Sequence, residues 1–170
     1  TVFLDEIGDM DPAVQPRLLK VLEERRFRRV GDTRDKQVDI RLIAATHQDL
    51  SELVRQQRFR SDLFFRISTI PLTVPPLRQR PQDIPEMVRH LLERCGREMG
   101  RTGVSVCPQA LDALSEHSWP GNIRELRNVL ERALLLGDGA EIRSQDLRLA
   151  GPGPPVSTLV GGEATLILAD

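Results

Sequence analysis

The sequence lacks the features of a disulfide-rich or zinc-binding protein. Its two cysteines, Cys95 and Cys107, both lie in apolar surroundings. Neither His90 nor His117 stands at a metal-ligand spacing from either thiol. Two isolated thiols of this kind are most simply explained as free cysteines in a reducing compartment. A disulfide framework and a structural zinc site are therefore not expected.

Long apolar runs and an excess of charge are also missing. No run is long enough to cross a bilayer, and no segment has the pattern of a signal peptide. The 24 basic and 25 acidic residues give a formal net charge of −1, which provides no overall attraction to nucleic acid. We therefore expect a cytoplasmic protein with no membrane partner.

A glycine-rich phosphate loop, GxxxxGK[ST], does not occur anywhere in the chain. The chain begins inside an apparent buried strand and without methionine, which indicates a fragment of a longer protein. Its 39% hydrophobic and 29% charged residues are typical of a globular protein. A chain of 170 residues can hold one domain with a full core, or one domain and a small satellite.

The first ten residues carry the strongest local pattern. The apolar run from Val2 to Leu4 suits a buried strand of a parallel sheet, and it ends in Asp5 and Glu6. Ligands bind beyond the carboxyl ends of strands in open α/β sheets. One carboxylate can hold hydrated Mg²⁺, and the other can orient or deprotonate an attacking water. The alternative is a strand followed by an ordinary polar turn.

A second core strand is expected at residues 41–45, after a hairpin over residues 27–40. This strand ends in Thr46 and His47, which would lie beside Asp5 and Glu6 if the two strands are neighbours. A polar residue here can contact a γ-phosphate or position water. The alternative is a turn whose side chains satisfy local backbone groups.

Arg60 and Arg66 flank Asp62 and two phenylalanines. Arginine suits recognition of a phosphoryl group across an interface, because its guanidinium is planar and always charged. The alternative is a pair of salt bridges to Asp62 or Asp83.

The second half of the chain is expected to be helical. A long helix starts at Pro81, and a candidate domain boundary lies at residues 100–103. Asn122 and Glu125 form an N-cap and N3 pair for a later helix. Arg124 stands in the first turn of that helix, where the helix dipole disfavours a cation unless an anion is bound nearby. The alternative is a surface arginine paired with Glu125.

In this order the segments resemble the AAA+ ATPase domain of bacterial enhancer-binding proteins, the activators of sigma-54 RNA polymerase, over about residues 1–149. Residues 1–9 resemble the Walker B motif, and residues 41–47 resemble the sensor I strand. Residues 59–66 resemble the arginine-finger segment, and residues 119–126 resemble the lid sequence that carries sensor II.

The resemblance implies roles for the two adjacent acids and the sensor I residues. Asp5 would serve Mg²⁺, through water, and Glu6 would polarise the water that attacks the γ-phosphate of ATP. Thr46 and His47 would sense the nucleotide, although many members have asparagine at the position of His47.

The arginines take further roles by the same resemblance. Arg124 aligns with the sensor II arginine and would bind the nucleotide of its own subunit. Arg60 and Arg66 align with arginine fingers that reach into the ATP of a neighbouring subunit. The parent protein would therefore form a homo-oligomer, a hexameric ring.

The expected fold is α/β: the rear half of a three-layer P-loop core with a parallel sheet, followed by a small helical lid. Residues 1–102 would belong to the core, residues 103–150 to the lid, and residues 151–170 to a linker. That linker would lead to a helix-turn-helix, absent here, through which the parent binds DNA. Hydrolysis would remodel the closed complex of the sigma-54 polymerase holoenzyme.

Two rival functions stay open at this point. Without a phosphate loop, the chain can instead be a non-catalytic oligomerisation or interaction module. Related AAA+ machines such as DNA-helicase loaders are a third, weaker alternative.

Overall fold

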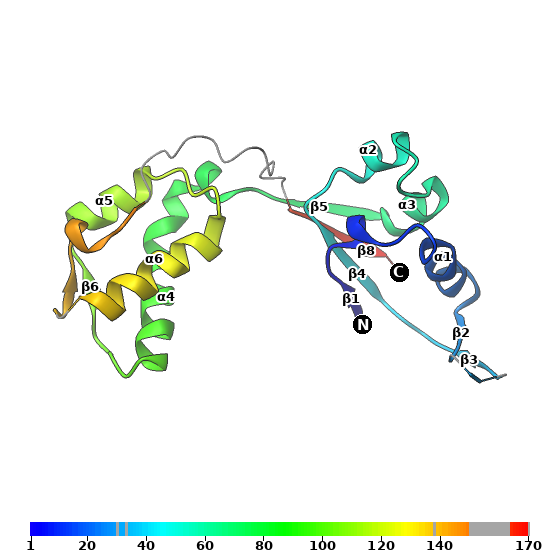
Figure 1. The fold of residues 1–170 in the computed structure, drawn as a ribbon, viewed down its shortest axis with the longest axis horizontal. Helices are drawn as coiled ribbons and strands as arrows, with labels where there is room; N and C mark the ends of the chain where they lie inside the picture. Colours follow the sequence, from blue (N-terminus) through cyan, green and yellow to red (C-terminus); the bar gives the residue numbers. More distant parts are fainter. Residues whose placement is uncertain (30, 33, 138, 150–163, 170) are drawn as a thin grey trace. The chain divides into compact units, whose positions relative to one another are not determined.

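The computed structural model describes residues 1–29, 31–32, 34–137, 139–149 and 164–169. These residues divide into two compact units, which we describe separately (Figure 1). The first unit contains residues 1–74 together with the C-terminal strand, and the second starts at Pro75. Within the described residues, no helix combines the length and apolar composition needed to cross a membrane.

A four-stranded sheet forms the centre of the first unit. Its order is β1 (Val2–Leu4), β4 (Leu42–Thr46), β8 (Ala164–Ala169) and β5 (Ile70–Val74). Strands β1 and β4 are parallel, whereas β8 is antiparallel to both β4 and β5. Strands β1, β4 and β5 therefore share one direction, in agreement with the predicted α/β class.

Strand β8 falls in the segment that was expected to be a linker. It lies between β4 and β5 and pairs with both along their lengths. On the sides where β4 and β5 face β8, their backbone N–H and C=O groups need hydrogen-bond partners, and the backbone of β8 provides them. A composition rich in glycine and proline just before it gave no sign of this pairing.

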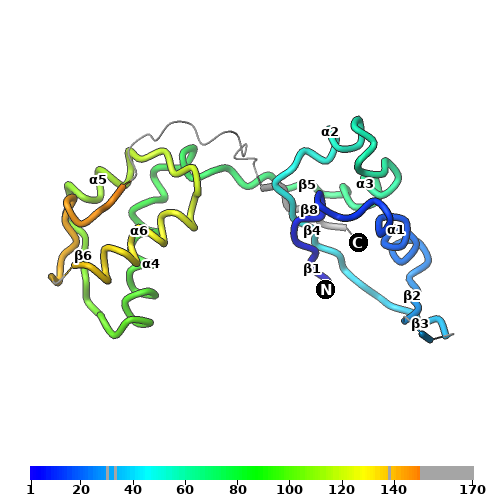
Figure 2. The backbone as a smooth tube through the Cα atoms, in the orientation of Figure 1, coloured from blue at the N-terminus to red at the C-terminus, as the bar shows by residue number. Residues whose placement is uncertain are grey.

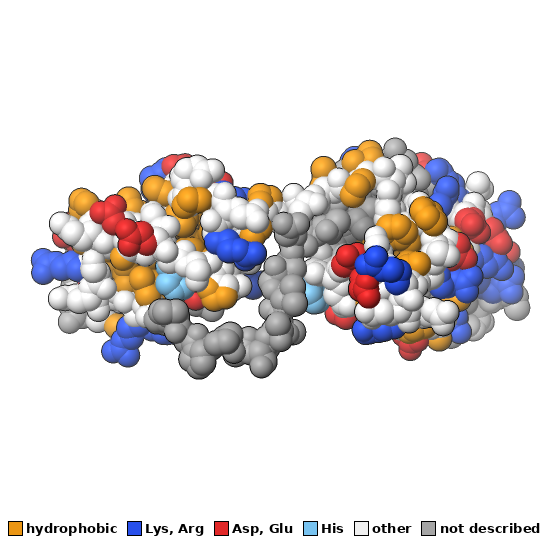
Figure 3. Space-filling view, turned by 90° about the horizontal axis from the view of Figure 1, so that it is seen from above, with side chains coloured by type: hydrophobic (Ala, Val, Ile, Leu, Met, Phe, Trp, Pro, Cys, Tyr) orange, Lys and Arg blue, Asp and Glu red, His pale blue; other side chains and the backbone are white. Residues whose placement is uncertain are grey.

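Helices α1 (Gln15–Glu24), α2 (Leu50–Arg55) and α3 (Ser61–Ile67) cover the sheet (Figure 1). The core between them is apolar: Ile7, Leu22, Leu42, Ala44, Leu50, Leu53, Phe59, Leu63 and Ile67. Leucine and alanine enter it from alternate positions of β4, as a strand with one buried face requires. Hydrophobic side chains also reach the surface of the unit (Figure 3).

Two local patterns of the sequence have clear outcomes in this unit: Asp11-Pro12 indicates a helix start, and Asp49 with Glu52 fits a capping box for a short helix. Helix α1 begins at Gln15 rather than at Pro12, because Asp11 closes a turn by accepting the N–H of Ala13. Helix α2 has the expected N-cap, since Asp49 accepts the N–H groups of Ser51 and Glu52. The predicted hairpin is present as β2 (Arg26–Arg28) and β3 (Asp35–Gln37), and it extends away from the sheet (Figure 2).

The second unit is helical. It contains η2 (Leu77–Gln79), η3 (Pro81–Asp83), α4 (Ile84–Glu98), α5 (Pro108–Glu116) and α6 (Asn122–Leu136). Short strands β6 (Ser105–Val106) and β7 (Glu141–Ile142) pair in parallel, and η4 (Ser144–Asp146) follows. The long helix expected from Pro81 thus starts with a separate 3-10 turn.

The boundary between the units lies earlier than the sequence indicated. It falls between Val74 and Pro75, not after residue 102. The reason is the apolar face of α4, since Ile84, Val88 and Leu92 are buried in one core with residues of α5 and α6. Helix α4 therefore belongs to the lid by packing, although glycines follow it in the sequence.

Candidate functional site

A tight turn directly after β1 presents the two adjacent acids. Glu6 has φ 52° and ψ 48°, a left-handed conformation that is uncommon outside glycine. Asp5 is exposed, and its Oδ1 accepts the N–H of Glu6 at 3.1 Å. The 3-10 turn η1 (Ile7–Asp9) then folds back onto the end of β4. Gly8 permits this approach, because a Cβ there would lie 2.7 Å from Oγ1 of Thr46.

The end of β4 supplies the residues that face this turn. Thr46 is buried, and its hydroxyl accepts the N–H of Gln48 at 3.1 Å. Nδ1 of His47 lies 2.7 Å from Oε2 of Glu6, and the backbone N–H of His47 donates to the same oxygen at 3.4 Å. The structure therefore brings Glu6 and His47 into direct contact.

Asp9 joins this cluster, although no sequence pattern pointed to it. Ligand atoms of Glu6, Asp9 and His47 all lie within 4.8 Å of one another, and Gln48 donates to the Asp9 carboxylate. All three residues are exposed. The sequence placed Mg²⁺ on Asp5, which is not one of these three. Asp5 is an accessible oxygen ligand of the kind that hydrated Mg²⁺ takes.

The two predicted finger arginines lie at opposite ends of α3. Arg60 precedes the helix and makes a bidentate pair with Asp62, at 3.0 Å and 2.7 Å. The hydrogen bonds from Arg60 lower the pKa of Asp62. A salt bridge between Arg60 and Asp62 was the predicted alternative to a role in phosphate binding. Arg66 instead donates to the carbonyl oxygen of Leu22 in α1 at 3.2 Å.

A strained turn leads into α6 in the second unit. Trp119 is fully buried with φ 49°, and its Nε1–H donates to the carbonyl of Leu114 at 2.8 Å. Asn122 has φ 50°, and its Oδ1 accepts the N–H of Leu77 at 2.7 Å. The Glu125 carboxylate accepts the N–H of Gly121 at 2.8 Å. The expected cap is thus wrong in detail, since Asn122 holds η2 rather than its own helix.

Arg124 is exposed in the first turn of α6. Within the described residues its guanidinium makes no hydrogen bond or ion pair. The alternative partner, Glu125, is used by the Gly121 N–H. A cation in the first turn of a helix that makes no ion pair among the described residues is the arrangement expected of an anion-binding arginine.

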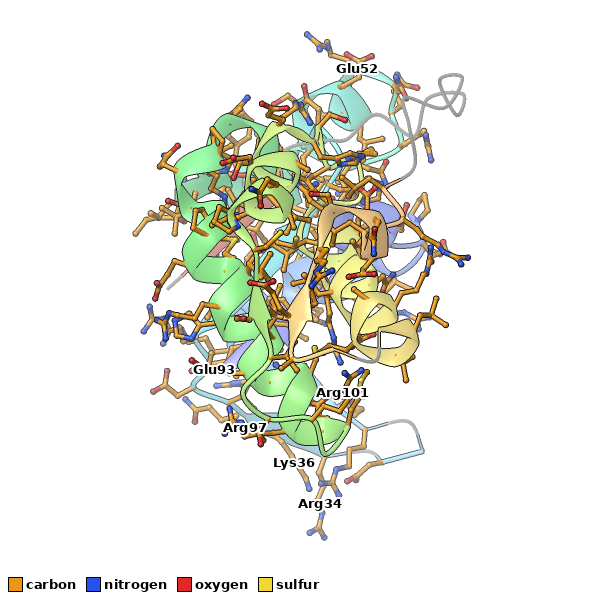
Figure 4. All side chains as sticks on the ribbon, turned by 90° about the vertical axis from the view of Figure 1, so that its left-hand side faces the viewer. Arg34, Lys36, Glu52, Glu93, Arg97 and Arg101 are labelled. Carbon is orange, nitrogen blue, oxygen red and sulfur yellow. The ribbon has the colours of Figure 1, made fainter. Side chains whose placement is uncertain are left out.

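A cavity of about 700 Å³ lies in the second unit between α4 and the β6 segment. Its lining includes Glu93 and Arg97, which Figure 4 shows on α4. None of the residues predicted from the sequence lines it. The predicted chemistry therefore does not involve this cavity.

Two family models match the chain in succession. The Sigma-54 interaction domain matches residues 1–73, and the AAA+ ATPase lid domain matches residues 78–151. The junction between the two matches coincides with the boundary between the two structural units.

Curated relatives include transcription regulators from several bacteria. The chain is 46% identical to the transcriptional regulatory protein ZraR of Salmonella typhimurium, over 96% of the chain and 37% of the relative. It is 45% identical to the formate hydrogenlyase transcriptional activator FhlA of Escherichia coli, over 96% of the chain and 24% of the relative. It is also 45% identical to the nitrogen fixation protein AnfA of Azotobacter vinelandii, over 86% of the chain and 28% of the relative.

Solved structures agree with these relatives. NtrX from Brucella abortus in complex with ADP superimposes with a TM-score of 0.78 at 38% identity, over 85% of this chain and 34% of that protein. NtrX in complex with ATP gives the same TM-score and identity, over 85% of this chain and 35% of that protein. The chain thus spans about a third of these neighbours. Together the two matched models cover most of the chain, which therefore belongs to the Sigma-54 interaction domain family in its first unit and to the AAA+ ATPase lid domain family in its second.

Proposed function

We propose that the chain is the rear part of an ATP-hydrolysing transcription activator that remodels the closed complex of sigma-54 RNA polymerase in the cytoplasm. The observation that carries this proposal is the contact between Glu6 and His47 at the ends of two neighbouring parallel strands. Ligands of open α/β sheets bind at such ends. The match to an AAA+ lid and the nucleotide complexes of NtrX support the same kind of site.

The acids and the sensor I residues serve the nucleotide of their own subunit in this proposal. Asp5 holds Mg²⁺ through water, and Mg²⁺ offsets phosphate charge when it is bound. Glu6 orients the attacking water and takes up its proton. Thr46 and His47 fix the position of Glu6 and of the water. Asp5, Glu6 and His47 are exposed at the edge of the sheet, so their side chains are accessible to a nucleotide. Thr46 is buried beside them.

The arginines balance the charge that builds up on the phosphates. Arg124 acts on the nucleotide of its own subunit, and its unpaired guanidinium supports that role. Arg60 and Arg66 act on the nucleotide of the neighbouring subunit in a hexameric ring. Arg60 gives up its ion pair with Asp62 when it binds a phosphate, because the carboxylate and the phosphate compete for the same guanidinium group. DNA is bound by a C-terminal helix-turn-helix outside this chain.

The test is the ATPase rate per subunit of the full-length protein, measured against protein concentration. A finger supplied in trans contributes about 10³- to 10⁵-fold to turnover. The rate per subunit is therefore expected to rise through the range in which the ring assembles, and Arg60→Ala is expected to suppress it. A rate that stays flat with concentration, or is unchanged by Arg60→Ala, would contradict the proposal. A full-length protein without ATPase activity would instead support a non-catalytic interaction module.

A further inference from the structure

The side chain of Gln15, the first residue of α1, is fully buried in the first unit. Both of its N–H donors and its oxygen bond to the backbone of two segments, one nearby in the sequence and one more than 40 residues away. Its Nε2 donates to the carbonyl of Met10 at 3.1 Å and to the carbonyl of Arg58 at 3.0 Å. Its Oε1 accepts the backbone N–H of Arg60 at 2.8 Å. Burial of an amide side chain costs free energy unless its polar atoms are hydrogen-bonded. The three backbone groups around Gln15 provide those bonds, so an amide side chain suits this position.

On one side, Gln15 holds the turn that carries the candidate catalytic acid. Glu6 and Met10 are the two ends of η1, since the carbonyl of Glu6 accepts the Asp9 N–H at 3.0 Å and the carbonyl of Ile7 accepts the Met10 N–H at 3.2 Å. Ile7 within this turn is buried. Glu6 and the Met10 carbonyl, to which Gln15 is bonded, therefore belong to the same hydrogen-bonded turn.

On the other side, Gln15 holds the start of the helix that carries both candidate fingers. Arg58 and Arg60 flank the buried Phe59, and Gln15 bonds to one backbone group on each side of it. The Gln15 amide thus pairs with this segment as a neighbouring strand would. The carbonyl of Arg60 in turn accepts the N–H of Phe64 in α3 at 3.0 Å.

We propose that Gln15 is a positioning residue that links the Glu6 turn of one nucleotide site to the finger helix serving the next. Through it, the state of the site in cis sets the placement of Arg60 toward the neighbouring subunit. This inference rests on the proposed function for its consequence, but the link itself is a property of the fold. Only an amide side chain offers two donors and an acceptor at once, so no other residue type reproduces all three bonds.

The kinetic test compares Gln15→Met with a control in the full-length protein. Methionine keeps the size of glutamine but leaves two carbonyls and one N–H without partners. We expect kcat to fall by about tenfold or more, with the nucleotide Kd unchanged within about twofold, because the groups are misplaced rather than removed. Leu42→Val, at a buried position at the far end of β4, is the control and is expected to keep kcat within about twofold. Equal losses of kcat in the two variants would overturn the proposal.

The Arg60→Ala background separates positioning from a general loss of stability. If Gln15 acts partly through Arg60, Gln15→Met lowers kcat by a smaller factor in the Arg60→Ala background than in the wild type. A full additional loss in that background would contradict the proposal. If Gln15→Met does not fold, Gln15→Glu replaces it, since it keeps the acceptor for Arg60 and offers at most one donor to the two carbonyls. A kcat within about twofold of wild type in Gln15→Glu would also contradict the proposal.

Hydrogen exchange at the Arg60 amide tests the link without any use of activity. The amide is expected to be protected in the wild type and in Leu42→Val, and to exchange faster in Gln15→Met. Unchanged protection in Gln15→Met overturns the link, whether or not the protein hydrolyses ATP. A wild-type protein without ATPase activity, together with faster exchange in Gln15→Met, removes the proposed function and leaves the link in place.

Discussion

Glu6 and His47 are 41 residues apart in the sequence, yet Oε2 of one lies 2.7 Å from Nδ1 of the other. The parallel register of β1 and β4 explains the contact, because Leu4 lies opposite Ala44 and both strands end at one edge of the sheet. The left-handed backbone of Glu6 then sets the turn that faces β4. Two polar residues that follow neighbouring strands thereby form one site.

Replacement of Glu6 by glutamine tests the role of this acid. Glutamine keeps the size of the side chain but cannot take up a proton from water. We expect the kcat for ATP of the full-length protein to fall by about 10²- to 10⁴-fold while nucleotide binding persists. Glu23→Gln, a change at an exposed acid of α1, is the matched control and should leave kcat unchanged. Equal activity of Glu6→Gln and Glu23→Gln would rule out the assigned role.

A series at Asn122 tests the turn before α6. Asn122→Asp keeps an acceptor for the Leu77 N–H, Asn122→Gly keeps only the freedom for φ 50°, and Asn122→Ala keeps neither. We expect stability in the order Asp, Gly, Ala, with about 1–3 kcal/mol lost when the Leu77 N–H has no acceptor. Trp119 is the only tryptophan and is buried in this unit, so its fluorescence during denaturation reports the transition. An alanine variant as stable as the aspartate variant would show that the Asn122 bond contributes nothing.

The second unit is also expected to lose stability in alkaline solution. Burial raises the pKa of the Cys95 thiol, and the nearby Glu131 carboxylate raises it further. Because the folded-state pKa is higher than the unfolded-state value, the stabilisation is complete below the ordinary thiol pKa. It is then lost as the pH rises toward the folded-state pKa. Denaturation of wild type and Cys95→Ala from pH 7.5 upward, about a unit below the ordinary thiol pKa, measures the effect.

The alanine variant is expected to lose less stability across that range than the wild type. Glu131→Gln removes the nearby carboxylate that raises the pKa of Cys95. Its free energy of unfolding should therefore fall with pH less steeply than in the wild type and more steeply than in Cys95→Ala. Parallel pH profiles for wild type and Cys95→Ala would exclude the thiol as the source of any alkaline loss.

The 170-residue chain expressed alone is expected to self-associate. Phe3 on edge strand β1 is 56% exposed, and alternate residues of the other edge strand, β5, are exposed as well: Ile70, Leu72 and Val74. Exposed apolar edges of this kind promote strand-to-strand association. Light scattering after size-exclusion chromatography should show oligomers of higher mass as the protein concentration is raised, and Phe3→Lys should reduce their amount. A monodisperse chain that melts cooperatively would contradict this expectation.

Local patterns in the sequence were sufficient to predict much of the first unit. The strand at Val2, the Asp49 cap and the hairpin each depend on residues close together in the chain, and each is present in the structure. The expected burial of that strand is wrong, because β1 lies at the edge of the sheet and Phe3 is 56% exposed. The family resemblance is confirmed as well, because it rests on four motifs in order. The roles of the individual site residues stay predictions.

Long-range packing explains what the sequence did not reveal. Gln15 looks like an ordinary polar residue at the start of a helix, and only the fold brings Arg58 and Arg60 to it. The lid boundary was misplaced for a similar reason, since glycines after α4 are visible in the sequence but the core that α4 shares with α6 is not. An element beginning near Thr165 was expected, but the pairing of β8 was not predicted because its partners lie about 90 to 130 residues upstream.

Subunit mixing tests whether the acids of one subunit and the arginines of its neighbour complete one ATPase site. Full-length Glu6→Gln retains its fingers, and full-length Arg60→Ala retains its acid, so each alone is expected to be nearly inactive. In an equal mixture, about a quarter of the interfaces in a closed ring pair an intact acid with an intact finger. The account predicts that the mixture regains ATPase activity well above the sum of the two variants measured separately. A mixture whose activity equals that sum, in rings shown to contain both variants, would contradict it.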